Sequence, residues 1–352
     1  MSNLHERPGV YSAYDTSSVV SGKRAVQAIG VAAKAAKGDV GRAVTVTGYA
    51  AGAAVFGEEE TPGMSVLLRL LFTGGASSVT AVRVADEGTA EDYRRAFNAL
   101  GKEDVRVLVC DSGDEDIQQA LRDAVEEASA LRRERIAVVG CGGAGVSALT
   151  ARAAALNSER VVLVGPDALD SAGKPLSGVF AAAAVAALAA AGGDPAVPLN
   201  GGELKGLSGL STDYSDNDID LLVRGGVTPL ECAAGVVSPV RGITTRTTTG
   251  GAPDATWREL TTILIVDDVI PAVRSALRSR FSRSKNTARN RAAIRSQVIV
   301  ELEKKLAAEI ISGYDGVRVT ASEEDPTVCL VEFGFSVAHG LNQVRLTVHI
   351  EI

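Results

Sequence analysis

The sequence predicts an α/β domain with a largely parallel sheet, followed by an α+β C-terminal domain with a mixed or antiparallel sheet and two long helices. Between residues 26 and 191, short apolar runs alternate with amphipathic segments, and the connections between them are short. Alternating strands and helices are typical of a parallel sheet, because each parallel return needs a crossover. From residue 257 onward, long helical patterns come first and strand-like runs follow. Extended arms are expected at both ends of the chain.

The expected elements of the α/β part follow from composition and spacing. Six runs rich in Val and Ile predict strands at residues 26–31, 44–47, 79–84, 105–110, 136–140 and 161–164. Helical spacing predicts helices at residues 64–72, 90–100, 115–131, 146–156 and 176–191. The helical pattern stops at Gly192-Gly193-Asp194-Pro195, so we place the end of the first domain at residue 195.

The C-terminal part has its own pattern. Residues 261–266 predict a strand, and Asp267 is the expected N-cap of a helix with Pro271 in its first turn. A second helix should bury every fourth residue, namely Ile294, Val298, Leu302, Leu306 and Ile310. Glu301 and Lys305 are expected to pair on the solvent side of this helix.

Composition excludes several classes of protein. The chain has 352 residues, 46% of them hydrophobic, which is enough for two domains with buried cores. A formal charge of −7 argues against binding nucleic acid by bulk electrostatics. The longest apolar run, residues 179–191, is too short to span a bilayer, and no apolar signal region opens the chain. We expect a protein made and assembled in the cytoplasm, without membrane insertion. Its four distant cysteines are expected to be reduced thiols: Cys110, Cys141, Cys232 and Cys329.

The strongest enzyme-like signal is a GxGxxG motif formed by Gly140, Gly142 and Gly145, which follows a predicted strand and precedes a predicted helix. Asp167 stands about twenty residues further on, as in dinucleotide-binding proteins. Glycines there let the backbone approach a pyrophosphate, whose charge the helix N-terminus stabilises. However, the motif does not open the first α/β unit. An NAD(P)-dependent Rossmann-type oxidoreductase is therefore the alternative function.

Other signs of chemistry are missing from the sequence. The histidines are His5, His339 and His349, all near the chain ends, so no hydride-transfer group stands near the glycine motif. No HExxH, Walker A or GxSxG pattern occurs. The acidic runs at residues 58–60 and 323–325 lie beside proline and predict solvated loops. We predict no catalytic residue, no cofactor and no metal site.

A basic stretch contrasts with the acidic chain. Residues 274–295 contain no Asp or Glu, but they include Arg274, Arg278, Arg280, Arg283, Lys285, Arg289, Arg291 and Arg295. The stretch suits a solvated corner, a nucleic-acid-binding module or a surface for an acidic protein. Nucleic-acid binding normally adds stacking aromatics, and Phe281 is the only aromatic residue in the stretch.

Several motifs resemble contractile phage tail sheath proteins, the sheath subunits of myophage or phage-tail-like bacteriocin particles. They are TWRELTTILIVDDVI from Thr256, IRSQVIVELEKKL from Ile294 and DPTVCLVEFGFSVAHGLNQVRLTVHI from Asp325. YSDNDID from Tyr214, GVTPLE from Gly226 and RPGVY from Arg7 extend the resemblance. It covers both ends of the chain, whereas residues 30–190 match less distinctively.

The resemblance implies a division into four parts: an N-terminal arm (1–22), an outer α/β domain (23–195), an inner, tube-facing domain (196–343) and a donated C-terminal strand (344–352). It implies stacked hexameric rings around a tail tube, with contraction, and with baseplate and tail-terminator proteins as further partners. The expected subunit contacts are Val10, Tyr11, Tyr14, Leu346, Val348 and Ile350. The expected tube contacts are Arg283, Lys285, Arg289, Arg291 and Arg295. Residues 344–352 also alternate apolar and polar side chains, as a strand that pairs with a partner would.

Overall fold

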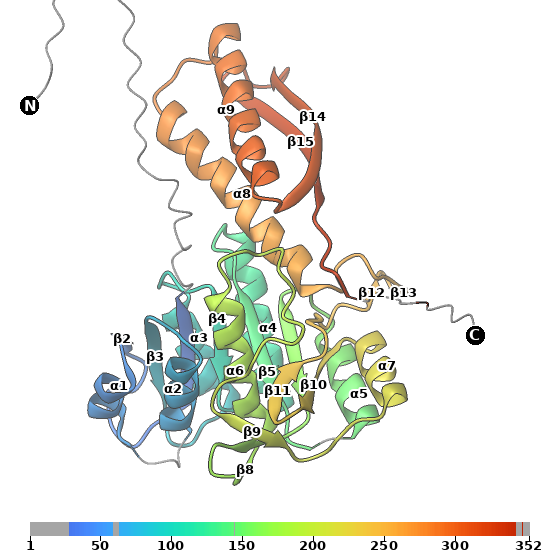
Figure 1. Cartoon of the computed structure of the whole chain (residues 1–352). Coiled ribbons are helices and arrows are strands. Elements are labelled where there is room, and N and C mark those ends of the chain that lie inside the picture. The colour runs from blue at the N-terminus through green and yellow to red at the C-terminus, as the bar shows by residue number, and fades with distance from the viewer. Residues whose placement is uncertain (1–27, 59–62, 144, 343–346, 348–352) are drawn as a thin grey trace, which may run out of the picture.

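The computed structural model describes residues 28–58, 63–143, 145–342 and 347. Among these residues, an eight-stranded sheet forms the centre of the larger part of the molecule (Figure 1). In spatial order its strands are β11 (Val236–Pro239), β10 (Val227–Ala233), β6 (Val161–Gly165), β5 (Ile136–Gly140), β4 (Val107–Cys110), β1 (Ile29–Lys34), β3 (Val79–Val84) and β2 (Ala43–Val46).

The main sheet is largely parallel, as the sequence predicts. Strands β10, β6, β5, β4, β1 and β3 pair in parallel, and only the edge strands β11 and β2 pair antiparallel. Every residue of β5 and β6 is buried, and their sequences are IAVVG and VVLVG. Continuous apolar runs of this kind are expected for strands that helices cover on both faces.

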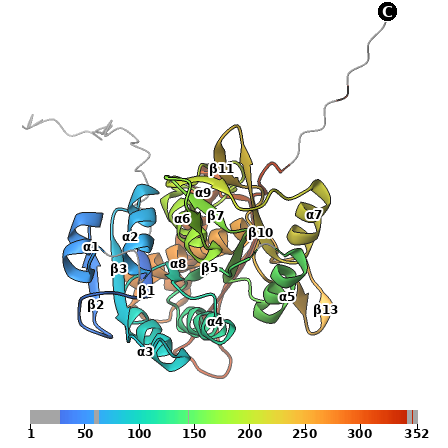
Figure 2. The same cartoon turned by 90° about the horizontal axis from the view of Figure 1, so that it is seen from below.

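Helices cover both faces of the main sheet and give the body three layers (Figure 2). On one face, α2 (Met64–Thr73) and α6 (Gly178–Ala191) pack on the central strands, and α1 (Tyr49–Phe56) packs against α2. The other face carries α3 (Ala90–Leu100), α4 (Glu115–Ala130), α5 (Val146–Leu156) and α7 (Asp216–Arg224). Helix α6 is mostly alanine, so its backbone can approach the sheet closely.

The main sheet continues beyond residue 195, where we predicted that the second domain begins. Strand β10 pairs with β6, and Leu230 and Val237 lie in the same hydrophobic core as α6. Packing therefore groups residues 227–239 with the α/β body. Two small sheets lie beside it: β8 (Pro175–Leu176), β7 (Ala168–Asp170) and β9 (Leu207–Leu210) form one, and β12 (Thr248–Thr249) and β13 (Ala252–Pro253) form the other.

The C-terminal residues form a separate lobe that projects from the body (Figure 1). It consists of α8 (Leu260–Phe281), α9 (Ala288–Ala307) and an antiparallel pair, β14 (Ile311–Ala321) and β15 (Cys329–Val337). The lobe has its own core, which includes Val269, Val298 and Leu302. None of the described helices is both long enough and apolar enough to cross a membrane.

The prediction of a strand at residues 261–266, with Asp267 as a helix cap, is wrong. Helix α8 begins at Leu260, and Pro271 lies inside it. Leu260 and Ile263 are buried in the core of the body, whereas Val269 and Val273 are buried in the core of the lobe. A helix that enters two cores buries several faces, so its apolar residues lose the single stripe that predicts a helix. The predicted pairing of Lys305 also differs: its Nζ lies 2.6 Å from Oδ2 of Asp268, and Glu301 instead pairs with Lys304.

Candidate interaction surfaces

The hairpin of β14 and β15 leaves two strand edges open among the described residues. The strands are 11 and 9 residues long, and each has only the other as a hydrogen-bonded neighbour in this part of the chain. Isolated two-stranded sheets are marginally stable, and long open edges bind further strands readily. The hairpin is therefore the strongest candidate for pairing with another chain.

Helix α9 packs on one face of this hairpin, and this packing stabilises the two-stranded sheet. Ile311 and Val317 of β14 are buried against the lobe core, and Phe333 and Phe335 of β15 pack on the same core. On the opposite face Arg318 stands across from Glu332 in the register, and both are exposed. One face of the hairpin is thus covered by α9, whereas its two strand edges have no hydrogen-bonded neighbour among the described residues.

The residues predicted to supply the pairing strands lie outside the described residues. These are Val10, Tyr11 and Tyr14 in the N-terminal arm, and Leu346, Val348 and Ile350 at the C-terminus. Their role stays a prediction.

The joint between α8 and α9 is held by local hydrogen bonds. The Thr287 side chain caps α9 by accepting a hydrogen bond from the Asn290 backbone N–H. The Asn290 amide donates to the Lys285 carbonyl at 2.7 Å. The Asn286 amide donates to the carbonyls of Pro326 and Val328 at 2.8 and 3.1 Å, which ties the joint to the turn between β14 and β15.

The five predicted tube-contact cations do not share one environment. Arg283, Lys285 and Arg289 are exposed, and none has an acidic partner in the described part of the chain. Arg291 is half-buried and donates to Oδ1 of Asn286 at 2.9 Å. Arg295 donates through Nε to the Val317 carbonyl at 3.0 Å. The last two guanidiniums therefore also hold the lobe together.

An open cavity of about 500 Å³ lies at the same end of the lobe. Phe281, Ile294 and Cys329 contribute apolar surface to it, and Lys285 and Arg291 contribute charge. A cavity with apolar walls and a cationic rim suits a segment of a partner protein that carries both apolar and acidic groups.

The glycine motif in the body has a packing role. A Cβ atom at Gly140 would lie 2.1 Å from the carbonyl oxygen of Gly178, in the first turn of α6. The Gln118 side chain donates to the Gly140 carbonyl at 2.9 Å. Gly140 is thus required because the start of α6 presses against the end of β5.

Asp167 does lie beside the glycine loop, as the motif predicts, but protein groups already engage its carboxylate. It accepts hydrogen bonds from the backbone N–H groups of Gly143 and Gly178, at 2.9 and 2.5 Å. In a dinucleotide site the acidic residue would bind the ribose, and the loop amides would face phosphate. Here the carboxylate takes the place of the anion and links the loop to α6.

At the carboxyl ends of the central strands, where ligands bind in many α/β sheets, polar groups of the protein also hydrogen-bond to one another. Asp111 follows β4 and accepts hydrogen bonds from the Tyr93 hydroxyl at 2.5 Å and the Lys34 backbone N–H at 3.0 Å. Burial raises the pKa of Asp111, and these hydrogen bonds offset the rise only in part. The described residues contain no group of three or more His, Cys, Asp or Glu arranged to hold a metal ion.

Two ion pairs between α8 and the body gave no signal in the sequence. Arg160, just before β6, makes two hydrogen bonds to Asp267, and Arg274 lies 2.7 Å from Oε1 of Glu134. Burial raises the pKa of Asp267, and the hydrogen bond and charge of Arg160 offset this only in part. Burial also opposes the ionisation of Glu134, but the hydrogen bond from Arg274, a backbone hydrogen bond and the charges of Arg274 and Arg106 together outweigh burial and lower its pKa.

Comparison with known proteins places these features in a family context. Residues 86–245 match the family model described as phage tail sheath protein central domain, and residues 252–351 match the phage tail sheath C-terminal domain. The tail sheath protein of Bacillus phage SP01 is 28% identical over 254 residues, which is 70% of this chain and 43% of that protein. The chain spans about half the length, or less, of the curated relatives it matches.

Solved structures share the fold. The sheath tail protein of Desulfitobacterium hafniense superposes with a TM-score of 0.72 at 12% identity, covering 94% of this chain and all of that one. The helical sheath of the anti-feeding prophage in its contracted state also gives a TM-score of 0.72, at 16% identity, covering 99% of this chain and 100% of that one. At such identities the likeness concerns the fold.

Proposed function

Because this chain belongs to the phage tail sheath family, we propose that it is the structural subunit of a contractile sheath. Copies of it would stack as hexameric rings around a tail tube and contract to drive the tube into a target envelope. The observation that carries the proposal is the β14–β15 hairpin, whose face is covered by α9 while both edges are open among the described residues. Open strand edges beside a well-packed core suit a subunit whose sheet gains strands from other copies.

Strand exchange is the proposed mode of assembly. Residues 1–22 of one copy and 344–352 of another would add to the edges of β14 and β15, with Val10, Tyr11 and Tyr14 in one arm and Leu346, Val348 and Ile350 in the other. Main-chain hydrogen bonds would supply affinity, and alternate side chains would set the register. Such links can persist while the bodies rotate, so rings could expand without separating.

The basic joint is the proposed contact with the tube. The exposed cations Arg283, Lys285 and Arg289 suit an acidic protein surface. Arg291 and Arg295 would add to it while also donating hydrogen bonds within the lobe. Exposed ion pairs are individually weak and salt-sensitive. Contacts of this kind would hold the tube before contraction and release it afterwards.

Baseplate proteins and a tail terminator are the remaining proposed partners, and we place assembly in the bacterial cytoplasm. Structural relatives include the anti-feeding prophage baseplate and its helical sheath in the contracted state. The matches therefore suit a phage tail and a tail-like injector equally well. No nucleotide enters this mechanism, because assembly itself would store the energy that contraction releases.

A matched pair of variants tests strand exchange. In the first, Leu346, Val348 and Ile350 are changed to Ser; in the second, the intervening Arg345, Thr347 and His349 are changed to Ser. Because side chains alternate along a strand, the first set should abolish tube formation and the second should leave most of it. Negative-stain electron microscopy reads out tubes, and circular dichroism checks folding. Equal tube formation by both variants would contradict the proposal.

The oxidoreductase alternative has its own test. Stoichiometric binding of NAD(H) by the purified protein, seen as a thermal shift and abolished by Gly142→Glu, would favour that function over the sheath. We expect no shift, since Asp167 already engages the loop amide of Gly143. A filter-binding assay across salt concentrations tests the nucleic-acid alternative in the same way.

A further inference from the structure

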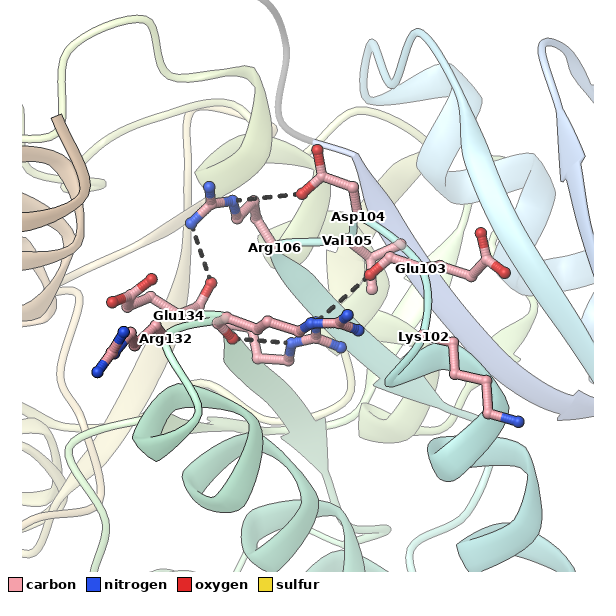
Figure 3. Close-up of a pocket in the computed structure, with 9 residues that line it drawn as sticks. Lys102, Glu103, Asp104, Val105, Arg106, Arg132 and Glu134 are labelled. Carbon is pink, nitrogen blue, oxygen red and sulfur yellow. Dashed lines mark hydrogen bonds and ion pairs between the residues drawn. The ribbon is translucent and has the colours of Figure 1, made fainter. Parts of the chain in front are cut away.

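A second charged surface lies on the body, at the amino ends of β4 and β5. The loops 101–106 and 131–135 border a cavity of about 240 Å³ there, and five cations stand against three acids: Lys102, Arg106, Arg132, Arg133 and Arg135 against Glu103, Asp104 and Glu134. Figure 3 shows the two loops converging, with Arg106 between Asp104 and the Glu134 carbonyl. Glu134 is itself neutralised by Arg274 of α8.

Two of these arginines have a structural task. Arg135 is buried and donates to the carbonyls of Leu100 and Glu103, and Arg133 donates to the Gly101 carbonyl at 2.6 Å. Both therefore satisfy carbonyls at the C-terminal end of α3, where a cation also interacts favourably with the helix dipole.

Arg106 is also engaged, by the Glu134 carbonyl and Asp104, which leaves Lys102 and Arg132. Among the residues that the structure describes, neither Lys102 nor Arg132 has an acidic partner within ion-pair distance, and both are exposed. They extend to opposite sides of the cavity (Figure 3). Leu131, next to Arg132 at the end of α4, is 69% exposed. The two loops thus present two unpaired cations and an exposed leucine to a partner, and such cations suit an acidic protein surface.

Helix α7 and the residues just before it carry surface groups of the opposite charge. Asp213 and Asp216 are exposed and have no hydrogen bond or ion pair through their side chains in the described part of the chain. Asp218 is used in the capping box with Ser215, and Asp220 pairs with Arg224. Leu221, on the same short helix, is 46% exposed. Residues 213–221 thus carry two unpaired acids and an exposed leucine, opposite in charge to the loop surface.

We propose that the loop surface of Lys102, Leu131 and Arg132 binds the acidic surface of Asp213, Asp216 and Leu221, on and just before α7, in a second copy of the chain. The inference rests on the proposed homopolymer and adds a body-to-body contact to its strand exchange. Two different surfaces that bind each other make a head-to-tail contact, and such contacts generate rings or helices. Each exposed ion pair should change affinity by no more than about fivefold, so the contact can form and break.

Charge reversal tests this contact in the full-length chain. Variant one carries K102E and R132E, and variant two carries D213K and D216K. Each variant then presents like charges on both surfaces, so each should self-associate at least about tenfold more weakly than the wild type at low salt. Mixing the two variants, or combining all four changes in one chain, restores opposite charges and should restore association. K37E with K205E, two exposed lysines elsewhere, is the matched control for charge.

Sedimentation velocity measures binding between copies, and electron microscopy measures tubes. Rescue by mixing or by the fourfold variant supports the contact even if the wild type forms no tubes, in which case only the sheath proposal fails. The inference is overturned if both double variants associate as strongly as the wild type. It is also overturned if the fourfold variant stays as weak as the double variants.

Discussion

The guanidinium of Arg160 in the body makes two hydrogen bonds to the carboxylate of Asp267 on α8, at 2.8 and 3.1 Å. The two side chains are 12% and 13% exposed. Because the N-terminal end of α8 is also buried in the body core and its middle in the lobe core, this helix is a shared structural element of both. The body and the lobe should therefore move as one unit.

Removing Arg160 should leave a nearly buried carboxylate without its cation. We expect Arg160→Met to lower the free energy of unfolding by about 3 kcal/mol at pH 7. The pKa of Asp267 is already raised by burial, so its contribution to stability is greatest below its unfolded pKa of about 3.9 and falls as pH rises. The deficit of Arg160→Met should therefore shrink toward pH 4. Urea unfolding across pH measures it.

The double variant Arg160→Met with Asp267→Leu is the control for this ion pair. Replacing both charges with apolar groups should recover most of the loss, because the pair then leaves no unpaired charge in the interface. Additive losses in the two single variants and the double variant would show that the two residues are not coupled.

Glu134 should show the opposite pH dependence. Its pKa is lowered, so its stabilising contribution is present above the unfolded value of about 4.3 and is lost as pH falls through the lowered pKa. We expect Glu134→Gln to cost about 1 kcal/mol at pH 7, since Arg274 is 36% exposed and solvent screens the pair. Thermal melts of both proteins should converge near pH 3. A difference that persists at pH 3 would argue against this ion pair.

The glycine motif offers a sharp comparison between neighbouring positions. Gly140→Ala should destabilise the protein by about 3 kcal/mol, because its Cβ would lie 2.1 Å from the Gly178 carbonyl oxygen. Gly142→Ala should change stability by less than about 0.5 kcal/mol, because the nearest atom, Oγ of Ser177, would be 3.6 Å away. Chemical denaturation separates the two. Equal effects would contradict a packing role for Gly140.

The basic joint should divide into two functional groups. Reversing Arg283, Lys285 and Arg289 to Glu should weaken binding to the tube protein while leaving the melting temperature unchanged. Reversing Arg291 and Arg295 should lower the melting temperature, because these side chains donate to Asn286 and to the Val317 carbonyl. Co-sedimentation with purified tube protein and thermal melts check both outcomes. The triple reversal of Lys37, Arg42 and Lys205 on the body is the charge control. Unchanged tube binding after reversal of Arg283, Lys285 and Arg289 would show that this surface does not contact the tube.

The parallel sheet could be predicted from the sequence because each of its central strands has a recognisable local pattern. Runs such as VVLVG are buried on both faces, and amphipathic helices separate them. The ends of an element are harder to predict where no turn residue marks them: the sequence predicts the first strand at residues 26–31, but β1 is Ile29–Lys34. Helix α1, a run of Ala and Gly with little amphipathic pattern, was missed.

The interaction surfaces could be predicted only in part. The charge of the basic stretch is visible in the sequence. The hydrogen bond from Arg295 to the Val317 carbonyl of β14 is not, because the two residues are 22 positions apart. The Arg160–Asp267 pair joins residues separated by 107 positions, and no local sequence pattern predicts such a contact. Likewise, the close approach of α6 that occupies the glycine motif is visible only once the chain is folded.

Cryo-electron microscopy of tubes formed by the purified full-length protein tests the central claim most directly. The account predicts that the sheet of β14 and β15 gains strands at both edges, and that those strands are residues 1–22 and 344–352 of neighbouring copies. A sheet whose edges remain open in the tube, or are filled by the chain's own two ends, would contradict it.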